Sequence, residues 1–282
     1  QKISVELKGS VLVVTTKKGT TEIKTVPVDD FPKLPAPDEK KAFLIPSSTL
    51  LTGFRSVWYA ASVSTVKPEL GSVYVYHHDW KMFFVATDSF RLAEKSIPLP
   101  KITSFDPILI PYKNVGDCMR ILESATGDVE VRVTPTQLGF YFDNVFVTSR
   151  LIDGMFPDYK QIIPKDPQTT VTCLKADLVQ TLKKAVVFSD SVHQIGFVVD
   201  PVKKVCTIRA TNADVGMIDE RIDATILGEP LSINFNYRYL LDCFQSIGAD
   251  SVSLSFSGPG RPLVVRGVGD PSFLYLAMPL NR

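Results

Sequence analysis

Three aspartates stand in turn-like stretches where carboxylates could catalyse hydrolysis: Asp88, Asp153 and Asp158. Two carboxyl groups held roughly 5 to 10 Å apart can act as acid and base, or as acid and nucleophile, on a glycosidic bond. One hypothesis is therefore a hydrolase that acts on a polysaccharide or a nucleotide. The other interpretation is that each aspartate hydrogen-bonds the backbone of its own turn, which accounts for the residue type without any reaction.

Histidine and glycine motifs offer little further chemistry. His77 and His78 are adjacent, and adjacent residues of a strand point to opposite faces, so they are poorly placed to hold one metal ion. We expect a surface hairpin there. Gly267 and Gly269 lack the strand–loop–helix context of a dinucleotide site, and no GxxxxGK[ST], HExxH or GxSxG motif occurs. The sequence therefore predicts a protein that is not an enzyme and uses no metal ion or cofactor.

Length and composition indicate a globular protein of two or more domains. The chain has 282 residues, whereas one domain typically has about 100 to 200. Hydrophobic residues make up 45% of it and charged residues 22%, which is enough apolar material for sizeable cores. A formal net charge of +1 excludes a uniformly basic nucleic-acid binder. It leaves open a binder whose charges are separated onto two faces.

The cysteines predict a reducing compartment. Cys118, Cys173, Cys206 and Cys243 are far apart and form no CxxC pair, which is typical of reduced thiols in the core of a cytosolic protein. No apolar run approaches the roughly 20 residues of a membrane span, and no charged-then-apolar leader precedes the first strand. We expect a cytoplasmic protein with no membrane partner.

A repeat divides the chain into modules. Three short strings recur in the same order: DFP at 30–32 as MFP at 155–157, ATD at 86–88 as ATN at 210–212, and DC at 117–118 as DC at 242–243. Their offsets are 125, 124 and 125 residues. Each match alone could arise by chance, and chance remains the alternative for all three. Their agreement in order and spacing favours tandem modules.

The pattern of apolar residues predicts the same kinds of secondary structure in both modules. Helical spacing predicts helices over 47–62, 113–125, 175–188 and 236–247. Alternation predicts strands such as 128–133, 145–150 and 251–256. Each module is therefore two helices packed on antiparallel strands, which is an α+β fold.

We expect three parts, with boundaries at residues 1–36, 37–163 and 164–282. Residues 1–34 contain strands but no helix, so they match only the end of a module. If the period holds, roughly 85 to 90 residues of that first module would precede Gln1. Under this interpretation the chain lacks most of its first domain.

Four strings point to a known family. Residues 83–93 read FFVATDSFRLA, 151–159 read LIDGMFPDY, 236–242 read NYRYLLD and 275–280 read YLAMPL. In this order they resemble segments of the middle and last domains of the bacterial β-type DNA sliding clamps. The resemblance covers essentially the whole chain, with the front of the first domain absent. It implies a DNA-clamp fold and a non-catalytic processivity factor, a ring that encircles duplex DNA and tethers the replicative polymerase.

The resemblance also implies a hydrophobic cleft between the middle and last domains that receives short linear peptides. Matched by motif, its lining is Leu70, Thr87, Ser89, Phe90, Arg91, Leu92, Pro157, Gln161, Ile162, Leu276, Ala277, Met278, Pro279 and Leu280. Met278 and Leu280 could bury the leucine and aromatic anchors of a peptide. Gln161 stands where the family commonly has a basic residue, so peptide preference can differ. The residues alone favour the other interpretation, in which core positions of half-buried strands are taken by Phe90, Leu92, Met278 and Leu280.

Basic residues on the predicted helices suggest the face toward DNA. The candidates are Arg55, Lys67, Lys113, Arg120, Lys175, Lys183, Lys184 and Arg238, while acidic residues concentrate in turns and on strand segments such as 128–130 and 219–220. Long cationic side chains make the sequence-independent phosphate contacts that sliding requires. Lys67 precedes Pro68 and Glu69, where the family suggests aromatic residues. The alternative is that all of these are ordinary solvated helix faces.

The partners implied by the resemblance are double-stranded DNA, the DNA polymerase III catalytic subunit, the clamp loader, and other polymerases and repair proteins that carry short linear motifs. A full-length clamp would be a head-to-tail homodimer. A chain without most of its first domain would be a monomer that still binds such peptides. A clamp-like adaptor that binds partners without loading on DNA is the remaining alternative.

Overall fold

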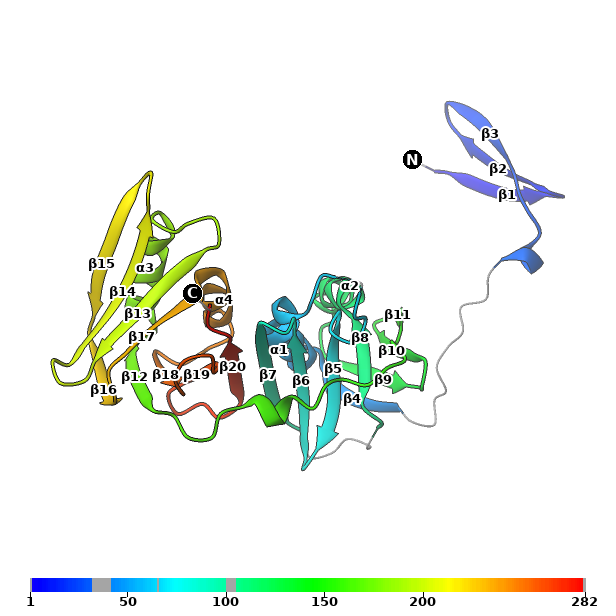
Figure 1. The fold of residues 1–282 in the computed structure, drawn as a ribbon. Coiled ribbons are helices and arrows are strands. Elements are labelled where there is room, and N and C mark those ends of the chain that lie inside the picture. The colour runs from blue at the N-terminus through cyan, green and yellow to red at the C-terminus, as the bar shows by residue number, and fades with distance from the viewer. Residues whose placement is uncertain (1, 32–41, 65, 100–104, 281–282) are drawn as a thin grey trace. The chain divides into compact units, whose positions relative to one another are not determined.

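A computed structural model describes residues 2–31, 42–64, 66–99 and 105–280. The chain divides into two compact units, Gln1–Ala36 and Pro37–Arg282 (Figure 1). None of the described helices is long and apolar enough to cross a membrane.

The first unit is a three-stranded antiparallel sheet. Its elements are β1 (Ser4–Lys8), β2 (Val11–Thr16), β3 (Gly19–Lys24) and a 3-10 turn, η1 (Val28–Asp30). Leu12 lies opposite both Leu7 and Ile23, so aliphatic side chains share one face. Leu7 and Ile23 are 64% and 48% exposed. Within the described residues of this unit, that apolar face therefore has no covering layer.

The second unit begins with a module of two helices and two antiparallel sheets. Its elements are β4 (Ala42–Pro46), α1 (Ser47–Val57), η3 (Trp58–Ala60), β5 (Ser72–His78), β6 (Lys81–Thr87), β7 (Arg91–Pro98), β8 (Ile108–Pro111), α2 (Tyr112–Leu122), β9 (Asp128–Val133), β10 (Gln137–Phe142) and β11 (Val145–Arg150). Pro46 and Pro111 each end a strand and immediately precede a helix, consistent with a residue that has no N–H to continue the ladder. The helix expected over 47–62 ends at Val57 and continues as the 3-10 turn η3.

A second module follows the connecting 3-10 turn η4 (Tyr159–Ile162). Its elements are β12 (Thr169–Leu174), α3 (Lys175–Val186), β13 (Gln194–Asp200), β14 (Val205–Asn212), β15 (Gly216–Ile222), β16 (Ala224–Gly228), β17 (Leu231–Asn236), α4 (Tyr237–Phe244), β18 (Ser251–Phe256), β19 (Leu263–Gly267) and β20 (Phe273–Ala277). The Asn236 side chain caps α4 by accepting a hydrogen bond from the Arg238 amide. Both helices predicted for this part of the chain are present.

Strand order confirms that the sequence repeat is a structural repeat. The order β11-β10-β9-β4 in the middle module corresponds to β20-β19-β18-β12 in the last, and β7-β6-β5-β8 corresponds to β15-β14-β13-β17. β16 is an addition that pairs with β12. The string ATD at 86–88 and its counterpart ATN at 210–212 both lie where the second strand of the four ends. The two modules therefore share one α+β architecture, with two helices packed on antiparallel sheets.

The two modules are joined by backbone pairing. β20 of the last module pairs antiparallel with β7 of the middle module, with Leu276 opposite Leu92 and Ala277 opposite Arg91. The result is a nine-stranded sheet in the order β16-β12-β18-β19-β20-β7-β6-β5-β8. Strand alternation sends Ala277 into the core beneath the helices and Leu276 into a second cluster. The sheet thus carries a helix-covered face and an outer face.

The segment between the modules crosses part of the outer face. Phe156 and Tyr159 are 8% and 5% exposed and pack with Leu92 and Leu276 in the second cluster. The Tyr159 hydroxyl donates a hydrogen bond to Glu94 and lies 2.8 Å from the Tyr76 hydroxyl. Burial and the neighbouring Glu94 carboxylate raise the pKa of Tyr159 above its ordinary value, so the hydroxyl stays protonated and can donate. The segment is therefore a fixed part of the fold.

All four cysteines are free and buried, as the sequence predicted. Burial raises the pKa of Cys118 and of Cys173 to about 11, and that of Cys206 to about 12. Thiols with such pKa values remain protonated near neutral pH, so they behave as small apolar core groups rather than nucleophiles.

Gly53→Ala in α1 should destabilise the protein. A Cβ atom at Gly53 would lie 2.3 Å from Cε2 of Phe84, whose ring is fully buried. We expect the free energy of unfolding to fall by about 1 to 3 kcal/mol, although alanine favours a helix by about 1 kcal/mol. Urea denaturation measures the change, with Gly248→Ala as the control because a Cβ there meets no atom within 4 Å. An unchanged midpoint for Gly53→Ala would contradict the packing described here.

Tyr159→Phe should loosen the crossing segment. Loss of the hydroxyl removes the donor to Glu94, and a partly buried carboxylate without its donor costs about 1 to 3 kcal/mol. Tyr141→Phe is the matched control, because the buried Tyr141 hydroxyl has no hydrogen-bond partner among the described residues. We expect thermal or urea unfolding to show a loss for Tyr159→Phe and no loss for Tyr141→Phe. Equal losses would show that the hydrogen bond does not stabilise the segment.

Candidate functional site

Most of the predicted cleft residues lie at the ends of β6, β7 and β20 or in the crossing segment, whereas Leu70 lies in the loop before β5. Five of them are buried: Leu70, Thr87, Leu92, Leu276 and Ala277. Another five are exposed, namely Ser89, Phe90, Pro157, Gln161 and Ile162, and the remaining four, Arg91, Met278, Pro279 and Leu280, are half-buried. The set therefore combines a buried base with a solvent-facing rim.

The base of this surface belongs to the second hydrophobic cluster. Leu92 and Leu276, opposite each other on β7 and β20, pack there with Phe156, Tyr159 and Val264. These leucines are core residues, as the alternative interpretation of the sequence proposed for Leu92. They support the surface from below, and little of either side chain is accessible to a ligand.

The rim is built on the turn between β6 and β7. Ser89 has a φ of +78°, and the Asp88 carboxylate accepts hydrogen bonds from the amides of Phe90 at 2.9 Å and Arg91 at 3.0 Å. Thr87 Oγ1 donates to the Arg91 carbonyl at 2.6 Å. This turn leaves the Phe90 side chain 60% exposed. A large aromatic group held in water by an ordered turn is a candidate contact for an apolar ligand.

The C-terminal residues form the opposite side of the same surface. The Met278 amide donates to the Phe90 carbonyl at 2.8 Å, and the Leu280 amide donates to the Asn234 carbonyl at 2.8 Å. The tail therefore extends the pairing of β20 with β7 and then reaches β17. Phe90 and Met278, from different modules, are linked directly by a backbone hydrogen bond.

Two predicted cleft residues face the other side of the sheet. Ala277 packs in the core beneath the helices, and the Arg91 guanidinium reaches α4, where Nη1 lies 2.5 Å from Asp242 Oδ2. Its Nε lies 3.0 Å from Asp88 Oδ2, and its Cζ lies 4.7 Å from the centre of the Tyr239 ring. Motif matching took consecutive residues together, whereas alternation along β7 and β20 separates them onto two faces.

Sequence reasoning missed several residues that shape this region. Tyr239 and Asp242 of α4 hold Arg91, and Glu94 of β7 holds Tyr159 of the crossing segment. The recurrence of Asp117 as Asp242 was a usable signal for α4. No pattern in the sequence pointed to Glu94, since its partner comes from a distant segment.

The predicted DNA-facing residues differ in exposure and in whether an acidic side chain pairs with their charge. Lys113 of α2, Lys183 of α3 and Arg238 of α4 are exposed, and Lys67 is exposed in the loop before β5. Lys175 donates to the Ile247 carbonyl at 2.6 Å. The other three are paired with acids: Arg55 with Glu123, Arg120 with Asp117, and Lys184 with Glu220. The expected separation of acids from the helices is incomplete, because Asp117, Asp177 and Asp242 lie on helices.

Two of the alternative catalytic candidates, Asp88 and Asp158, have hydrogen-bond partners within their own loops. The Asp88 carboxylate is occupied by its own turn and by Arg91, which confirms the turn interpretation. Asp158 accepts a hydrogen bond from Gln161 at 2.7 Å. His77 and His78 end β5 in a hairpin with β6, and His78 pairs with Asp79 at 3.2 Å. Among the described residues, no group of three or more histidine, cysteine and acidic side chains could hold a metal ion.

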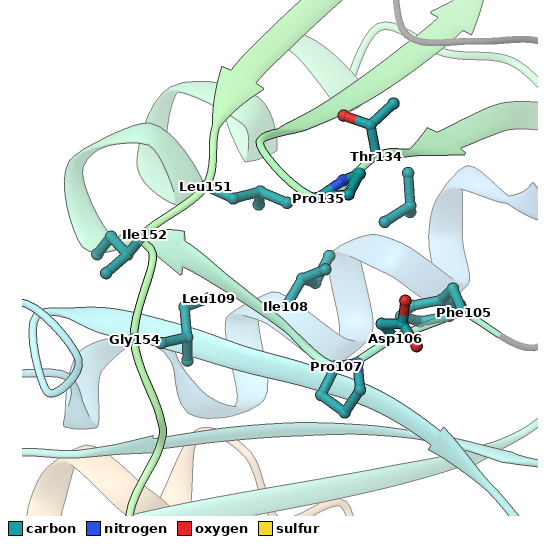
Figure 2. A pocket seen from close by; sticks show the side chains of 11 residues that line it. Phe105, Asp106, Pro107, Ile108, Leu109, Thr134, Pro135, Leu151, Ile152 and Gly154 are labelled. Atoms are coloured by element: carbon teal, nitrogen blue, oxygen red, sulfur yellow. The ribbon is translucent and has the colours of Figure 1, made fainter.

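Two hollows of the surface have no pair of carboxylates among the described residues that line them. Figure 2 shows one hollow in the middle module, between the start of β8, the β9–β10 turn and the segment after β11. Its lining is largely aliphatic, including Ile108, Leu109 and Leu151, and Asp106 is the one charged residue among the described residues of the lining. A second hollow lies where α1 meets the residues after α4, with Arg55 and Ser246 in its lining. Asp88, Asp153 and Asp158 line neither hollow.

Comparison with known proteins agrees with this architecture. Residues 44–158 match the model for the DNA polymerase III beta subunit central domain, and residues 160–281 match the model for its C-terminal domain. The beta sliding clamp of Caulobacter vibrioides is 29% identical over 277 residues, which are 96% of this chain and 74% of that protein. The beta sliding clamp of Bacillus subtilis is 27% identical over 285 residues, 99% of this chain and 75% of that protein.

Solved structures show the same fold. The crystal structure of the DNA polymerase sliding clamp from Bacillus subtilis aligns with a TM-score of 0.91 and 26% identity, over 99% of this chain and 75% of that one. The Caulobacter crescentus beta sliding clamp, solved with PEG bound to a proposed beta-motif tethering region, aligns with a TM-score of 0.90 and 27% identity, over 99% and 76%. With two family models that together span most of its length, this chain belongs to the family of DNA polymerase III beta subunits, the bacterial beta sliding clamps.

Proposed function

We propose that this protein is a sliding clamp, a non-catalytic processivity factor that encircles duplex DNA and holds replication and repair proteins there through a peptide-binding cleft. The observation that carries the proposal is the nine-stranded sheet shared by the two modules. Helices with exposed cations cover one face of it, and an apolar rim with Phe90 and Met278 lies at the joint on the other side. Binding DNA and binding proteins are thereby assigned to different surfaces.

The proposed cleft consists of the rim residues Phe90, Pro157, Gln161, Ile162 and Met278 above the buried Leu92 and Leu276. Phe90 and Ile162 are 60% and 52% exposed, so both side chains are accessible to a ligand. A short peptide with a leucine and an aromatic anchor would bury them. The tethering region named for the Caulobacter clamp supports such a surface in this family.

The partners that fit this surface are proteins with short linear motifs. We assign to it the DNA polymerase III catalytic subunit, the clamp loader, and other polymerases and repair proteins, all of which act in the cytoplasm. Several proteins can share one apolar cleft because the anchors, not the whole partner, are recognised. The proposed domain boundaries remain 1–36, 37–163 and 164–282.

Contact with DNA is assigned to the helix-covered side. Lys113, Lys183 and Arg238 are exposed there, one each on α2, α3 and α4. A ring is held on DNA by topology, so its phosphate contacts need to be few and weak. The acidic partners of Arg55, Arg120 and Lys184 keep the total attraction moderate, which is compatible with sliding.

Ring closure requires a second copy of the protein. β15 is the counterpart of β7 and lies at the edge of its sheet, where Met217 is 61% exposed. β3 lies at the edge of the first unit's sheet and follows β2 as β20 follows β19. We propose that β3 of one copy pairs with β15 of the other, as β20 pairs with β7 inside the chain. A full-length clamp closed in this way would be a head-to-tail homodimer, whereas a chain without most of the first domain is expected to be a monomer.

Peptide binding tests the proposed cleft. A fluorescein-labelled peptide with one leucine and a C-terminal phenylalanine should bind the chain, measured by fluorescence anisotropy. Phe90→Ala and removal of residues 278–282 should each weaken binding by about tenfold or more, since anchor contacts of this kind carry over 1 kcal/mol. Trp80→Ala is the control, because Trp80 is also 67% exposed but lies in the β5–β6 turn. Unchanged affinity after the truncation would remove the assignment.

Salt dependence tests the DNA-facing side. The binding constant of the chain for a duplex oligonucleotide should fall as salt is added. A plot of the logarithm of this constant against the logarithm of the salt concentration should be linear, with a slope of about −0.9 for each phosphate contact. Replacing Lys113, Lys183 and Arg238 by alanine should make that slope less steep by about three contacts. A control with Lys81, Lys165 and Lys203 replaced, which are exposed outside the helices, should keep the slope. Equal changes in both variants would contradict the assignment.

A further inference from the structure

Asp242 of α4 makes an ion pair across the joint between the two modules. Its Oδ2 atom lies 2.5 Å from Nη1 of Arg91 on β7. The Arg91 side chain is 14% exposed, and Asp88 and the ring of Tyr239 contact the same guanidinium. The Asp242 side chain is 42% exposed, so the pair is partly enclosed, and removing it would leave Arg91 with one acidic partner fewer and let the guanidinium shift or draw in water. The position of Arg91 therefore depends on a residue of the other module.

Arg91 also stabilises the turn between β6 and β7, which forms the cleft rim. Asp88 binds the Arg91 side chain through one carboxylate oxygen and the amides of Phe90 and Arg91 through the other. The Phe90 carbonyl accepts the Met278 amide at 2.8 Å. A shift of the Arg91 guanidinium would therefore move both Phe90 and Met278, because Phe90 belongs to this turn and Met278 is hydrogen-bonded to it.

The repeat shows that the turn itself does not need this ion pair. In the last module, Asn212 accepts hydrogen bonds from the amides of Asp214 at 2.9 Å and Val215 at 3.3 Å, which is the same type of turn. Gly216 takes the place of Arg91 by strand register, because Met217 lies opposite Thr211 as Leu92 lies opposite Thr87. Asp117, the counterpart of Asp242, pairs within its own helix with Arg120 at 2.8 Å. The ion pair across the sheet is thus a feature of the joint that carries the proposed cleft.

We propose that Asp242 is a positioning residue for the peptide-binding cleft. It holds Arg91, and through Arg91 and Asp88 it fixes Phe90 and the attachment of Met278 in the arrangement that an apolar peptide anchor requires. Asp242 does not itself touch the peptide. The inference rests on the proposed function and deepens it, because it assigns the rim geometry to a residue of the helix layer.

The test is peptide affinity in a double-mutant cycle. With the labelled leucine–phenylalanine peptide, Asp242→Ala should raise Kd about tenfold, and Asp242→Asn should raise it less, because an amide oxygen still accepts from Arg91. Asp177→Ala, which removes an acidic residue from α3, should leave Kd unchanged. In an Arg91→Ala background, Asp242→Ala should change Kd by less than twofold, since its effect acts through Arg91. Circular dichroism and a melting curve check that each variant is folded.

Three outcomes separate the possibilities. Tight binding by Asp242→Ala, or fold-changes for Arg91→Ala and Asp242→Ala that multiply in the double variant, would overturn the positioning role while leaving the cleft in place. Should Asp242→Ala fail to fold, Asp242→Asn carries the same cycle. Failure of the unmodified chain to bind the peptide would instead overturn the proposed function, and the positioning role with it.

Discussion

The pairing of β20 with β7 is the interaction on which the rest of the second unit depends. Five residue pairs, from Phe273 opposite Lys95 to Ala277 opposite Arg91, join strands that are far apart in the sequence. Backbone hydrogen bonds fix the register, and register decides which side chains reach which face. A slip of one residue would exchange Leu276 with Ala277 between the outer cluster and the helix-side core, and both packing layers would be lost.

This register gives the two faces of the joint different tasks. On the outer face, Leu92 and Leu276 support an apolar surface that is completed by the crossing segment and the tail. On the helix side, Arg91 binds Asp242, and Ser246 Oγ donates to the Ser56 carbonyl at 3.0 Å. The same strands therefore support the proposed protein-binding surface on one face and contact the helices on the other. These contacts fix the position of the surface relative to the helices.

The repeat explains why the outer face differs between the modules. In the middle module, Tyr74 lies opposite Val85 and stacks on Phe156 of the crossing segment, with ring centres 4.7 Å apart. In the last module, Gly196 and Arg209 take the corresponding places. Arg209 pairs with Asp219 and is 50% exposed. Apolar residues are thus found where a segment covers the sheet, and small or charged residues where the sheet faces water.

Local features of the fold could be predicted from the sequence, and distant contacts could not. Alternation placed β9, β11 and β18 at their observed bounds, and helical spacing located all four α-helices within a few residues, because both signals are contained in one segment. Motif resemblance brought Phe90 and Met278 together. It did not separate Arg91 from Leu92, although alternation would have done so. The partners Glu94, Glu123 and Asp242 depend on topology, which pairs residues more than 60 positions apart.

The joint between the modules is the surface that we propose for peptide binding. Hydrogen–deuterium exchange with and without the labelled peptide tests it most directly, because amide protection reports where a ligand binds without any substitution. When peptide is bound, exchange should become slower in residues 88–92, 157–163 and 276–280. Protection confined to other parts of the chain, such as the β13–β14 strands, would contradict it.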